Sequence, residues 1–334
     1  MPDIHDWLEI QDDFTDGLLL GNGSSIAIHR GFNYESLFIE ARDQGCITPT
    51  VAEVFRQFGV NDFEEVLRKL WQTKQVLQAL ELPSLRVEEA YAEVRTALIS
   101  TVRSSHVSYR DAEPHLPHIF SFMKRFSTVV SLNYDLIVYW AAMLGNDHLE
   151  TTWFKDGFLD GEFSEDWQRL RRPYRGAERT TLYFYPHGNL VLKRTRIGER
   201  KVSAGLPGLL DSILRQWERG NAVPIFVCEG TTEHKKKSIQ NSSYLQRVFS
   251  EVLPDLNRSL VIYGWRMSEQ DQHIVDQLRR HPPRRVAVSV RGGNQEFALE
   301  AERILEAVGV EEIVFFDSAS PGCWNNPRLR PLRL

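Results

Sequence analysis

The chain has 334 residues, of which 42% are hydrophobic and 25% are charged, and its formal net charge is −5 at pH 7. Such a length and composition are typical of a globular protein of one or two domains. The net negative charge gives no general footprint for nucleic acid.

No apolar run approaches the roughly 20 residues that cross a bilayer. The acidic start, MPDIHDWLEI, lacks the apolar core of a signal peptide. We therefore expect a cytoplasmic protein that acts neither on membranes nor directly on nucleic acid.

The cysteines Cys46, Cys228 and Cys323 are far apart and form no Cys-x-x-Cys pair. This spacing favours neither a disulfide framework nor a four-thiolate zinc site, and we expect no metal cofactor. His115 and His118 have a metal-like spacing, but Pro117 breaks the helix geometry that would aim both rings at one ion.

The first motif follows an apolar run, Leu18–Leu20, which predicts a buried parallel strand. The strand leads into a turn formed by Gly21, Asn22, Gly23, Ser24 and Ser25. We expect a helix from Ile26, capped by Ser24 or Ser25. The free amide groups at the start of this helix, and its dipole, favour an anion there. Dinucleotide folds seat a pyrophosphate in this way, although a tight connection is an equally ordinary use of such a turn.

A helical insertion is predicted over residues 45–126. Apolar residues recur at three- and four-residue spacing from Thr50 to Trp71, from Val87 to Leu98 and from about His118 to Phe126. We interpret these wide aromatic stripes as core.

The second predicted strand, Ser127–Leu132, runs into Asn133-Tyr134-Asp135 and a helix over 136–144. Residues 145–179 are polar, carry both charges and contain spaced aromatic residues, which predicts a surface excursion or small subdomain. The third strand, Thr181–Tyr185, leads to Pro186-His187-Gly188, and Asn189–Lys193 is expected to form a short partner strand.

The C-terminal half alternates between helices and strands. Helices are predicted over 206–219, 237–252, 268–280 and 294–308, and strands over 224–228, 259–263, 285–290 and 313–316. This order predicts an α/β fold: one domain over residues 1–334, with a doubly wound Rossmann-like parallel sheet, helices on both faces and the helical insertion after the first strand.

Ligands of such sheets bind outside the carboxyl ends of the strands. The residues that follow predicted strand ends are Gly21, Asn133, His187, Glu229 and Gly264. Each also has a structural interpretation, because turns, helix caps and loops use the same residue types. Their convergence on one crevice is the functional hypothesis.

Taken in order, four motifs resemble the sirtuin-like superfamily. They are Gly21-Asn22-Gly23-Ser24-Ser25, Asn133-Tyr134-Asp135, Pro186-His187-Gly188 and the segment from Tyr263-Gly264-Trp265 to Asp271. Sirtuins have a Gly-Ala-Gly-x-Ser turn, a Thr-Gln-Asn-x-Asp motif, a His-Gly dipeptide and a late strand that ends in a glycine beside the cofactor. The resemblance is strongest to bacterial sirtuin-like NAD-cleaving domains of anti-phage defence.

That resemblance implies an NAD glycohydrolase, which cleaves the nicotinamide–ribose bond and releases nicotinamide and ADP-ribose. By analogy, Asn133 would hold the nicotinamide ribose and orient water, Asp135 would accept from the carboxamide, and His187 would be the general base. The expected cofactor-binding residues are Gly21, Asn22, Gly23, Ser24, Ser25, Phe32, Glu229, Gly264 and Asp271.

Several departures from the sirtuin pattern affect the binding of acyl-lysine substrates more than the binding of NAD. The two zinc-binding Cys-x-x-Cys pairs are missing, Asn22 stands where alanine is usual, and Leu132 replaces glutamine. These changes count against a protein deacylase or ADP-ribosyltransferase. A non-catalytic sensor of NAD or ADP-ribose stays open as the alternative. Because unregulated NAD cleavage would poison a cell, we expect a homo-oligomer or a partner subunit to control the activity.

Overall fold

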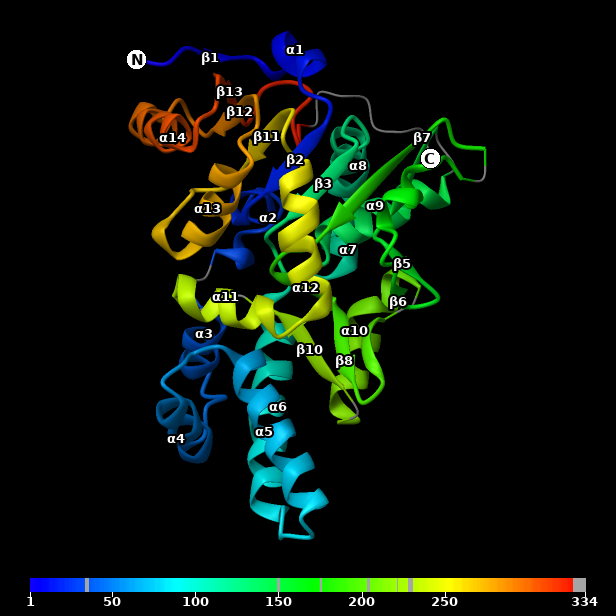
Figure 1. Cartoon of the computed structure of the whole chain (residues 1–334), viewed down its shortest axis with the longest axis vertical. Helices are drawn as coiled ribbons and strands as arrows, with labels where there is room; N and C mark the ends of the chain where they lie inside the picture. The colour runs from blue at the N-terminus through cyan, green and yellow to red at the C-terminus, as the bar shows by residue number, and fades with distance from the viewer. Residues whose placement is uncertain are drawn as a thin grey trace.

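The computed structural model describes residues 1–33, 36–148, 151–174, 176–202, 205–220, 222–227 and 231–326. In this part of the chain, an eight-stranded sheet has the order β1-β13-β12-β11-β2-β3-β7-β4, and its neighbouring strands pair in parallel (Figure 1). The strands are β1 (Ile4–His5), β2 (Gly17–Leu20), β3 (Thr128–Ser131), β4 (Thr152–Lys155), β7 (Arg179–Phe184), β11 (Ser259–Tyr263), β12 (Arg285–Val290) and β13 (Glu312–Asp317).

The strand order places a topological switch point between β2 and β11. From β2 the chain builds outward through β3 and β7, and it later returns to the other side of β2 through β11, β12 and β13. This is the order of the dinucleotide-binding folds, in which ligands bind at the switch point. The apolar runs of β2, β3 and β11 are buried at every position, as strands covered on both faces must be.

A long helical segment follows the first strands of the chain. Its helices are α3 (Leu37–Asp43), α4 (Pro49–Phe58), α5 (Phe63–Ala79), α6 (Leu85–Ser105), α7 (Tyr109–Ala112) and α8 (Leu116–Met123). Gly59 ends α4 in the left-handed conformation, with φ of 64°, and the Asp62 side chain caps α5, so the stripe from Thr50 to Trp71 belongs to two helices.

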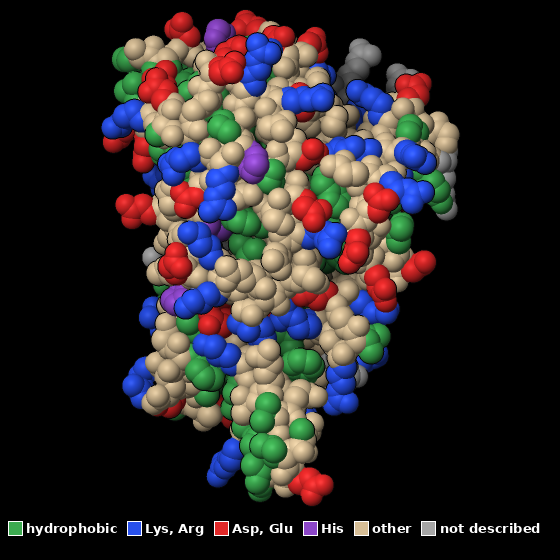
Figure 2. Space-filling view, in the orientation of Figure 1, with side chains coloured by type: hydrophobic (Ala, Val, Ile, Leu, Met, Phe, Trp, Pro, Cys, Tyr) green, Lys and Arg blue, Asp and Glu red, His purple; other side chains and the backbone are tan. Residues whose placement is uncertain are grey.

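Helices α5 and α6 pack on each other as a hairpin that projects from the rest of the chain (Figure 1). Figure 2 shows hydrophobic side chains gathered at the free end of this hairpin, where Val76, Leu80, Leu82 and Leu85 are half exposed or more. The base of the hairpin is tied to the body through Arg194 of β8, which lies 3.4 Å from the buried Glu64 of α5.

The remaining helices alternate with the strands. They are α1 (Trp7–Ile10), α2 (Asn22–Ile26), α9 (Ile137–Asp147), α10 (Leu209–Glu218), α11 (Thr232–Gln240), α12 (Ser243–Arg247), α13 (Gln272–Arg280) and α14 (Gln295–Val308). Short 3-10 segments are η1 (Gln11–Asp13), η2 (Arg30–Phe32), η3 (Glu113–His115), η4 (Trp167–Arg171), η5 (Leu206–Gly208), η7 (Leu253–Asp255) and η8 (Glu269–Asp271), and a π-helical turn, η6, spans Val248–Val252.

Two small antiparallel sheets complete the described fold. One joins β8 (Gly188–Thr195) to β9 (Gly198–Lys201) and β10 (Val223–Phe226), and the other pairs β5 (Phe158–Leu159) with β6 (Glu162–Phe163). The prediction that the strand near Pro224 belongs to the parallel sheet is therefore wrong. A short apolar run fits either kind of sheet, and here Phe226 stacks on Tyr134 while its strand pairs with β8.

The predicted fold class is confirmed: the protein is α/β, with a parallel sheet and a long helical segment after its first strands. The stretch 145–179 contains β4, which extends the parallel sheet beside β7. None of the helices in the described ranges is long and apolar enough to cross a membrane.

Candidate functional site

The turn after β2 differs in detail from its prediction. Helix α2 begins at Asn22, with Gly21 as its N-cap, and ends where the sequence predicts a helix start. Ser24 and Ser25 are consequently buried inside α2 and do not cap it. Their hydroxyl groups instead donate to Gly21 O, at 2.8 Å, and to the carboxylate of Asp135.

The glycines let this turn interlock with the turn after β11. Gly23 N donates to Gly264 O at 2.8 Å, and Gly21 N donates to Tyr263 O at 3.0 Å. A Cβ on Gly21 would lie 2.5 Å from Trp265 Cα, and one on Gly264, where φ is 67°, would lie 2.4 Å from Ser24 N. Only residues without a side chain allow so close an approach.

This interlock changes what the turn can offer to a phosphate. The amide groups of Gly21, Gly23 and Ser24 already donate to backbone carbonyls, the last of them to Gly21 O at 3.0 Å. Asn22 and Gly23 form the exposed side of the turn. A diphosphate would therefore meet the Asn22 side of α2, because the amide groups of Gly21 and Gly23 donate to Tyr263 O and Gly264 O and that of Ser24 donates within the turn.

Asn133 is the centre of a buried hydrogen-bond cluster. It lies two residues beyond the end of β3, and its Nδ2 is 3.0 Å from Gly21 O, 3.1 Å from Ser24 Oγ and 2.9 Å from Ser25 Oγ. Because both hydroxyl groups donate elsewhere, they accept from Asn133, so the amide nitrogen faces α2. The predicted turn and the predicted asparagine therefore meet at the carboxyl ends of β2 and β3.

Asp135 ends this chain of hydrogen bonds. Its Oδ2 accepts from Ser25 Oγ at 2.5 Å, and its Oδ1 accepts from Ile137 N at 2.9 Å. Burial raises the pKa of the Asp135 carboxyl group, although both hydrogen bonds act in the opposite direction. Its backbone oxygen accepts from Asn189 Nδ2, which ties the segment to β8.

His187 lies three residues beyond β7, beside this cluster. Its ring makes a hydrogen bond with the backbone of Leu132, the residue before Asn133, and its Nε2 lies 2.8 Å from Nε2 of His273 on α13. Burial, together with the positive charge of Lys235, lowers the pKa of His187 well below its usual range, and Asp271 opposes this shift. The ring is therefore neutral at pH 7, as a general base must be.

Asp271 accepts from two donors in a largely buried position. Lys235 Nζ donates to its Oδ1 at 2.7 Å, and Trp265 Nε1 donates to its Oδ2 at 3.0 Å. Burial opposes ionisation of Asp271, but the charge of Lys235 and the hydrogen bonds from Lys235 and Trp265 outweigh it and lower the pKa of this carboxyl group. Trp265 thus connects the Gly264 turn to the surroundings of His187.

The ring of Phe32, another expected site residue, takes no part in the hydrogen bonds described above. Phe32 is buried in η2, where its ring meets the edge of His106 at 5.3 Å, while Asn22 Nδ2 donates to Phe32 O at 3.2 Å. Glu229 lies outside the described residues. The expected convergence therefore concerns the Gly21–Ser25 turn, Asn133, Asp135, His187, Gly264 and Asp271.

The sequence analysis does not assign Lys235 or His273 to the site, because a solvated helix start is the favoured interpretation of the run His234–Lys237. Lys235 stands in a run of three lysines and reads as solvated, yet it is 6% exposed. A signal was present, because Lys235, Ser238 and Ile239 have the spacing of one helix face, and all three are buried. His273 similarly precedes Ile274 and Leu278 on the buried face of α13.

His187, Asp271 and His273 each place a possible metal-ligand atom within 4.8 Å of the others. Two features favour a hydrogen-bonded pair of rings over a shared ion. The Nε2 atoms of the two histidines are 2.8 Å apart, a hydrogen-bond distance, whereas two nitrogens bound to one tetrahedral ion at about 2.0–2.1 Å each would lie about 3.3 Å apart. Both Asp271 oxygens, moreover, already accept from donors.

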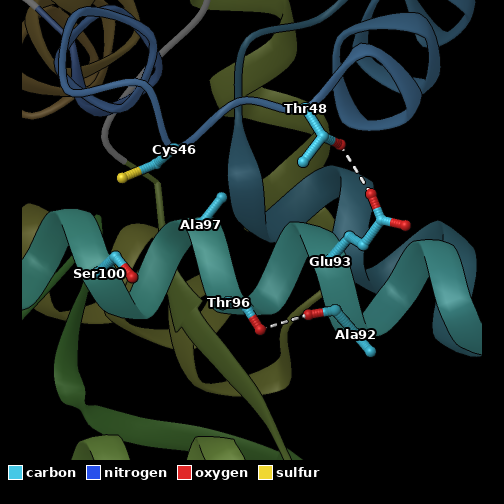
Figure 3. A pocket seen from close by; sticks show the side chains of 7 residues that line it. All are labelled: Cys46, Thr48, Ala92, Glu93, Thr96, Ala97 and Ser100. Atoms are coloured by element: carbon cyan, nitrogen blue, oxygen red, sulfur yellow. Dashed lines mark hydrogen bonds between the residues drawn. The ribbon is translucent and has the colours of Figure 1, made fainter.

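A pocket of about 290 Å³ lies elsewhere, between α6 and the segment before α4 (Figure 3). It is lined by Cys46, Thr48, Ala92, Glu93, Thr96, Ala97 and Ser100. Three of its polar side chains are hydrogen-bonded, since Thr48 Oγ1 donates to Glu93 Oε2 and Thr96 Oγ1 donates to Ala92 O. None of the expected site residues lines it.

Comparison with known proteins gives a family without an assigned function. No curated protein matches the sequence. The family model described as a domain of unknown function, DUF4917, matches residues 18–324, which include the turn after β2 and the strand ends described above. Because this match covers most of the chain, the protein belongs to the DUF4917 family.

Proposed function

We propose that this protein is an NAD glycohydrolase, which transfers the ADP-ribosyl group of NAD to water and releases nicotinamide. The observation that carries the proposal is the position of Asn133. Its amide joins the Gly21–Ser25 turn to Asp135 at the carboxyl ends of adjacent parallel strands, next to a topological switch point. The resemblance to sirtuin-like NAD-cleaving domains supports the choice of NAD among dinucleotides.

Cleavage of NAD depends more on the positioning of the reactants than on strong acid–base catalysis. Cleavage of the nicotinamide–ribose bond passes through a positively charged, oxocarbenium-like ribose, and the enzyme must hold the ribose, the leaving group and a water molecule. In this proposal Asn133 orients the ribose and water, and Asp135, whose oxygens accept from Ser25 Oγ and Ile137 N, would accept from the carboxamide as well. His187 is a neutral base beside them.

This proposal is tested by measuring nicotinamide released from NAD by the full chain. We expect Asn133→Ala and His187→Ala each to lower the rate at least 100-fold, since each removes a group that positions or activates the reactants. Asn146→Ala is the matched control, because Asn146 is a buried asparagine that holds Phe154 through two hydrogen bonds away from β2.

A non-catalytic sensor of NAD or ADP-ribose is the second candidate. The observation that favours it is that the polar groups of Asn133, Asp135 and Asp271 already have partners within the protein. A sensor would bind NAD saturably and release no nicotinamide. Calorimetric binding beside the release assay separates the two candidates.

A further inference from the structure

The hydrogen bonds around His187 determine which of its nitrogens carries the proton. Nε2 faces His273 Nε2 at 2.8 Å, so the ring's hydrogen bond with the Leu132 backbone involves Nδ1. That bond favours the protonated form of the ring, as a carbonyl acceptor does. With Nε2 turned toward His273, a proton on Nδ1 and a lone pair on Nε2 form the arrangement that agrees with both contacts.

The state of His273 follows from the same pair. Because His187 Nε2 has a lone pair, the hydrogen between the rings belongs to Nε2 of His273. Its other nitrogen, Nδ1, is then an acceptor, and it is buried without a partner among the described residues. The opposite tautomer would bury an unpaired N–H donor there, a rarer condition in proteins than an unpaired acceptor.

We propose that His273 is a positioning residue that holds His187 in the tautomer with its proton on Nδ1 and its lone pair on Nε2. In this role the N–H of His273 donates to Nε2 of His187, the nitrogen that would act as the base. A substrate hydroxyl group would replace this donor. Its bearing on catalysis rests on the proposed NAD cleavage, whereas the tautomer itself does not.

The charged groups that face His187 are Lys235 of α11 and Asp271 of η8, and they act in opposite directions on its pKa. The charges of Lys236 and Asp276 act on His273. Variants of His273 leave these side chains in place. His273→Gln removes the same ring charge as His273→Phe, so a pKa rise of His187 that is confined to His273→Phe reports the lost hydrogen bond.

Two variants of His273 separate the hydrogen bond from packing. His273→Gln keeps an N–H donor near the position of Nε2, whereas His273→Phe keeps a ring beside Phe249 but has no donor. Accepting a hydrogen bond stabilises the neutral form of His187. We therefore expect its pKa to rise by about one pH unit in His273→Phe, and to stay within about 0.3 of the wild-type value in His273→Gln.

The measurement is long-range ¹H–¹⁵N NMR of the histidine-labelled full chain, with the His187 signals assigned by His187→Gln. Ring nitrogen shifts give the tautomer directly, and we expect a protonated Nδ1 at pH 7. A protonated Nε2 on His187, or equal pKa values in the wild type and His273→Phe, would overturn the proposal. So would stoichiometric Zn²⁺ bound by the wild type and lost in His273→Phe, since the rings would then share an ion.

If nicotinamide is released, the acid limb of the pH profile of kcat/KM should move upward in His273→Phe and not in His273→Gln. A pKa change seen by NMR without any nicotinamide release would support the role of His273 and contradict NAD cleavage. The two failures are therefore distinguishable.

Discussion

His106 shows how burial of a single ring sets the pH dependence of stability. Its Nδ1 donates to Val107 O at 2.7 Å, and its Nε2 accepts from Leu136 N at 3.1 Å. Burial lowers its pKa to about 4, although the Val107 carbonyl acts in the opposite direction. Below pH 6.5 the unfolded chain protonates this ring, while the native protein does not until about pH 4.

The sign of the effect follows from this difference. Because the unfolded state binds the extra proton, the free energy of unfolding should fall by about 3 kcal/mol between pH 6.5 and pH 4 through His106 alone. His106→Gln keeps an acceptor for Leu136 N without titrating, so urea unfolding of this variant should depend less on pH. His281→Gln, at an exposed position, is the control, and equal pH slopes in all three proteins would contradict the account.

The Lys235–Asp271 pair gives a second prediction at this scale. Both side chains are largely buried, with 8% and 17% exposed, so removing one charge leaves the other poorly solvated. We expect Lys235→Met to lower the free energy of unfolding by about 3 kcal/mol, and the addition of Asp271→Asn to restore part of that loss. Urea unfolding measures both, and a double variant no more stable than Lys235→Met would refute the pairing.

Asp271 also makes the free energy of unfolding depend on pH under acidic conditions. Its pKa is lowered to about 2, so its contribution is present above about pH 4 and is lost as the pH falls toward 2. In Asp271→Asn, the free energy of unfolding should not show this loss between about pH 4 and pH 2. Its window lies below that of His106, so the two effects can be read from one series of unfolding curves.

At the scale of elements, the interlocked turns after β2 and β11 hold the centre of the sheet together. Gly264 has a φ of 67°, and a Cβ there would meet Ser24 N at 2.4 Å. Gly59 has a nearly equal φ of 64°, but a Cβ there would meet open space. The two glycines thus share the backbone conformation and differ in the contact.

This difference makes Gly59→Ala a control for Gly264→Ala. Both variants carry the cost of a left-handed alanine, about 1 kcal/mol, and Gly264→Ala must also separate two backbones. We expect Gly264→Ala to be less stable than Gly59→Ala by at least about 2 kcal/mol in chemical denaturation. Equal losses would mean that the two turns do not depend on this close contact.

The sequence predicts the elements whose signals are local. The runs at 259–263 and 285–290 contain β-branched residues and are followed by glycines, and the structure has β11 and β12 at those bounds. Such a run does not determine which distant strand it pairs with. The sequence therefore does not predict that β10 pairs with β8 in a separate sheet. The predicted start of α2 at Ile26 is likewise wrong, because Ser24 and Ser25 suit a helix cap but here donate to Gly21 O and to Asp135.

Some residues of the candidate site can likewise be predicted from local sequence signals, and others cannot. Asn133 and His187 follow strands that could be located, so their approach to the Gly21–Ser25 turn was predictable from parallel pairing. The partners of Asp271 were not, because Lys235 is separated from it by 36 positions and stands within a run of lysines. Only the packing of α11 against α13 and η8 brings the two together.

At the scale of the molecule, one sheet brings two parts of the chain to a shared edge, the first with β2, β3 and β7 and the second with β11, β12 and β13. The turn after β2 and Asn133 come from the first part, whereas Gly264 and Asp271 come from the second. His187 and His273 join the two parts through a hydrogen bond. A ligand bound at this edge would therefore contact both parts, which is the arrangement expected of a dinucleotide site.

The most direct test of this account is the rate at which the full chain releases nicotinamide from NAD, compared with Asn133→Ala at matched thermal stability. The account predicts release by the wild type and by Asn146→Ala, and a loss of at least 100-fold in Asn133→Ala. Equal release by Asn133→Ala would place the chemistry elsewhere. No release and no NAD binding by the wild type would contradict a dinucleotide site at this edge.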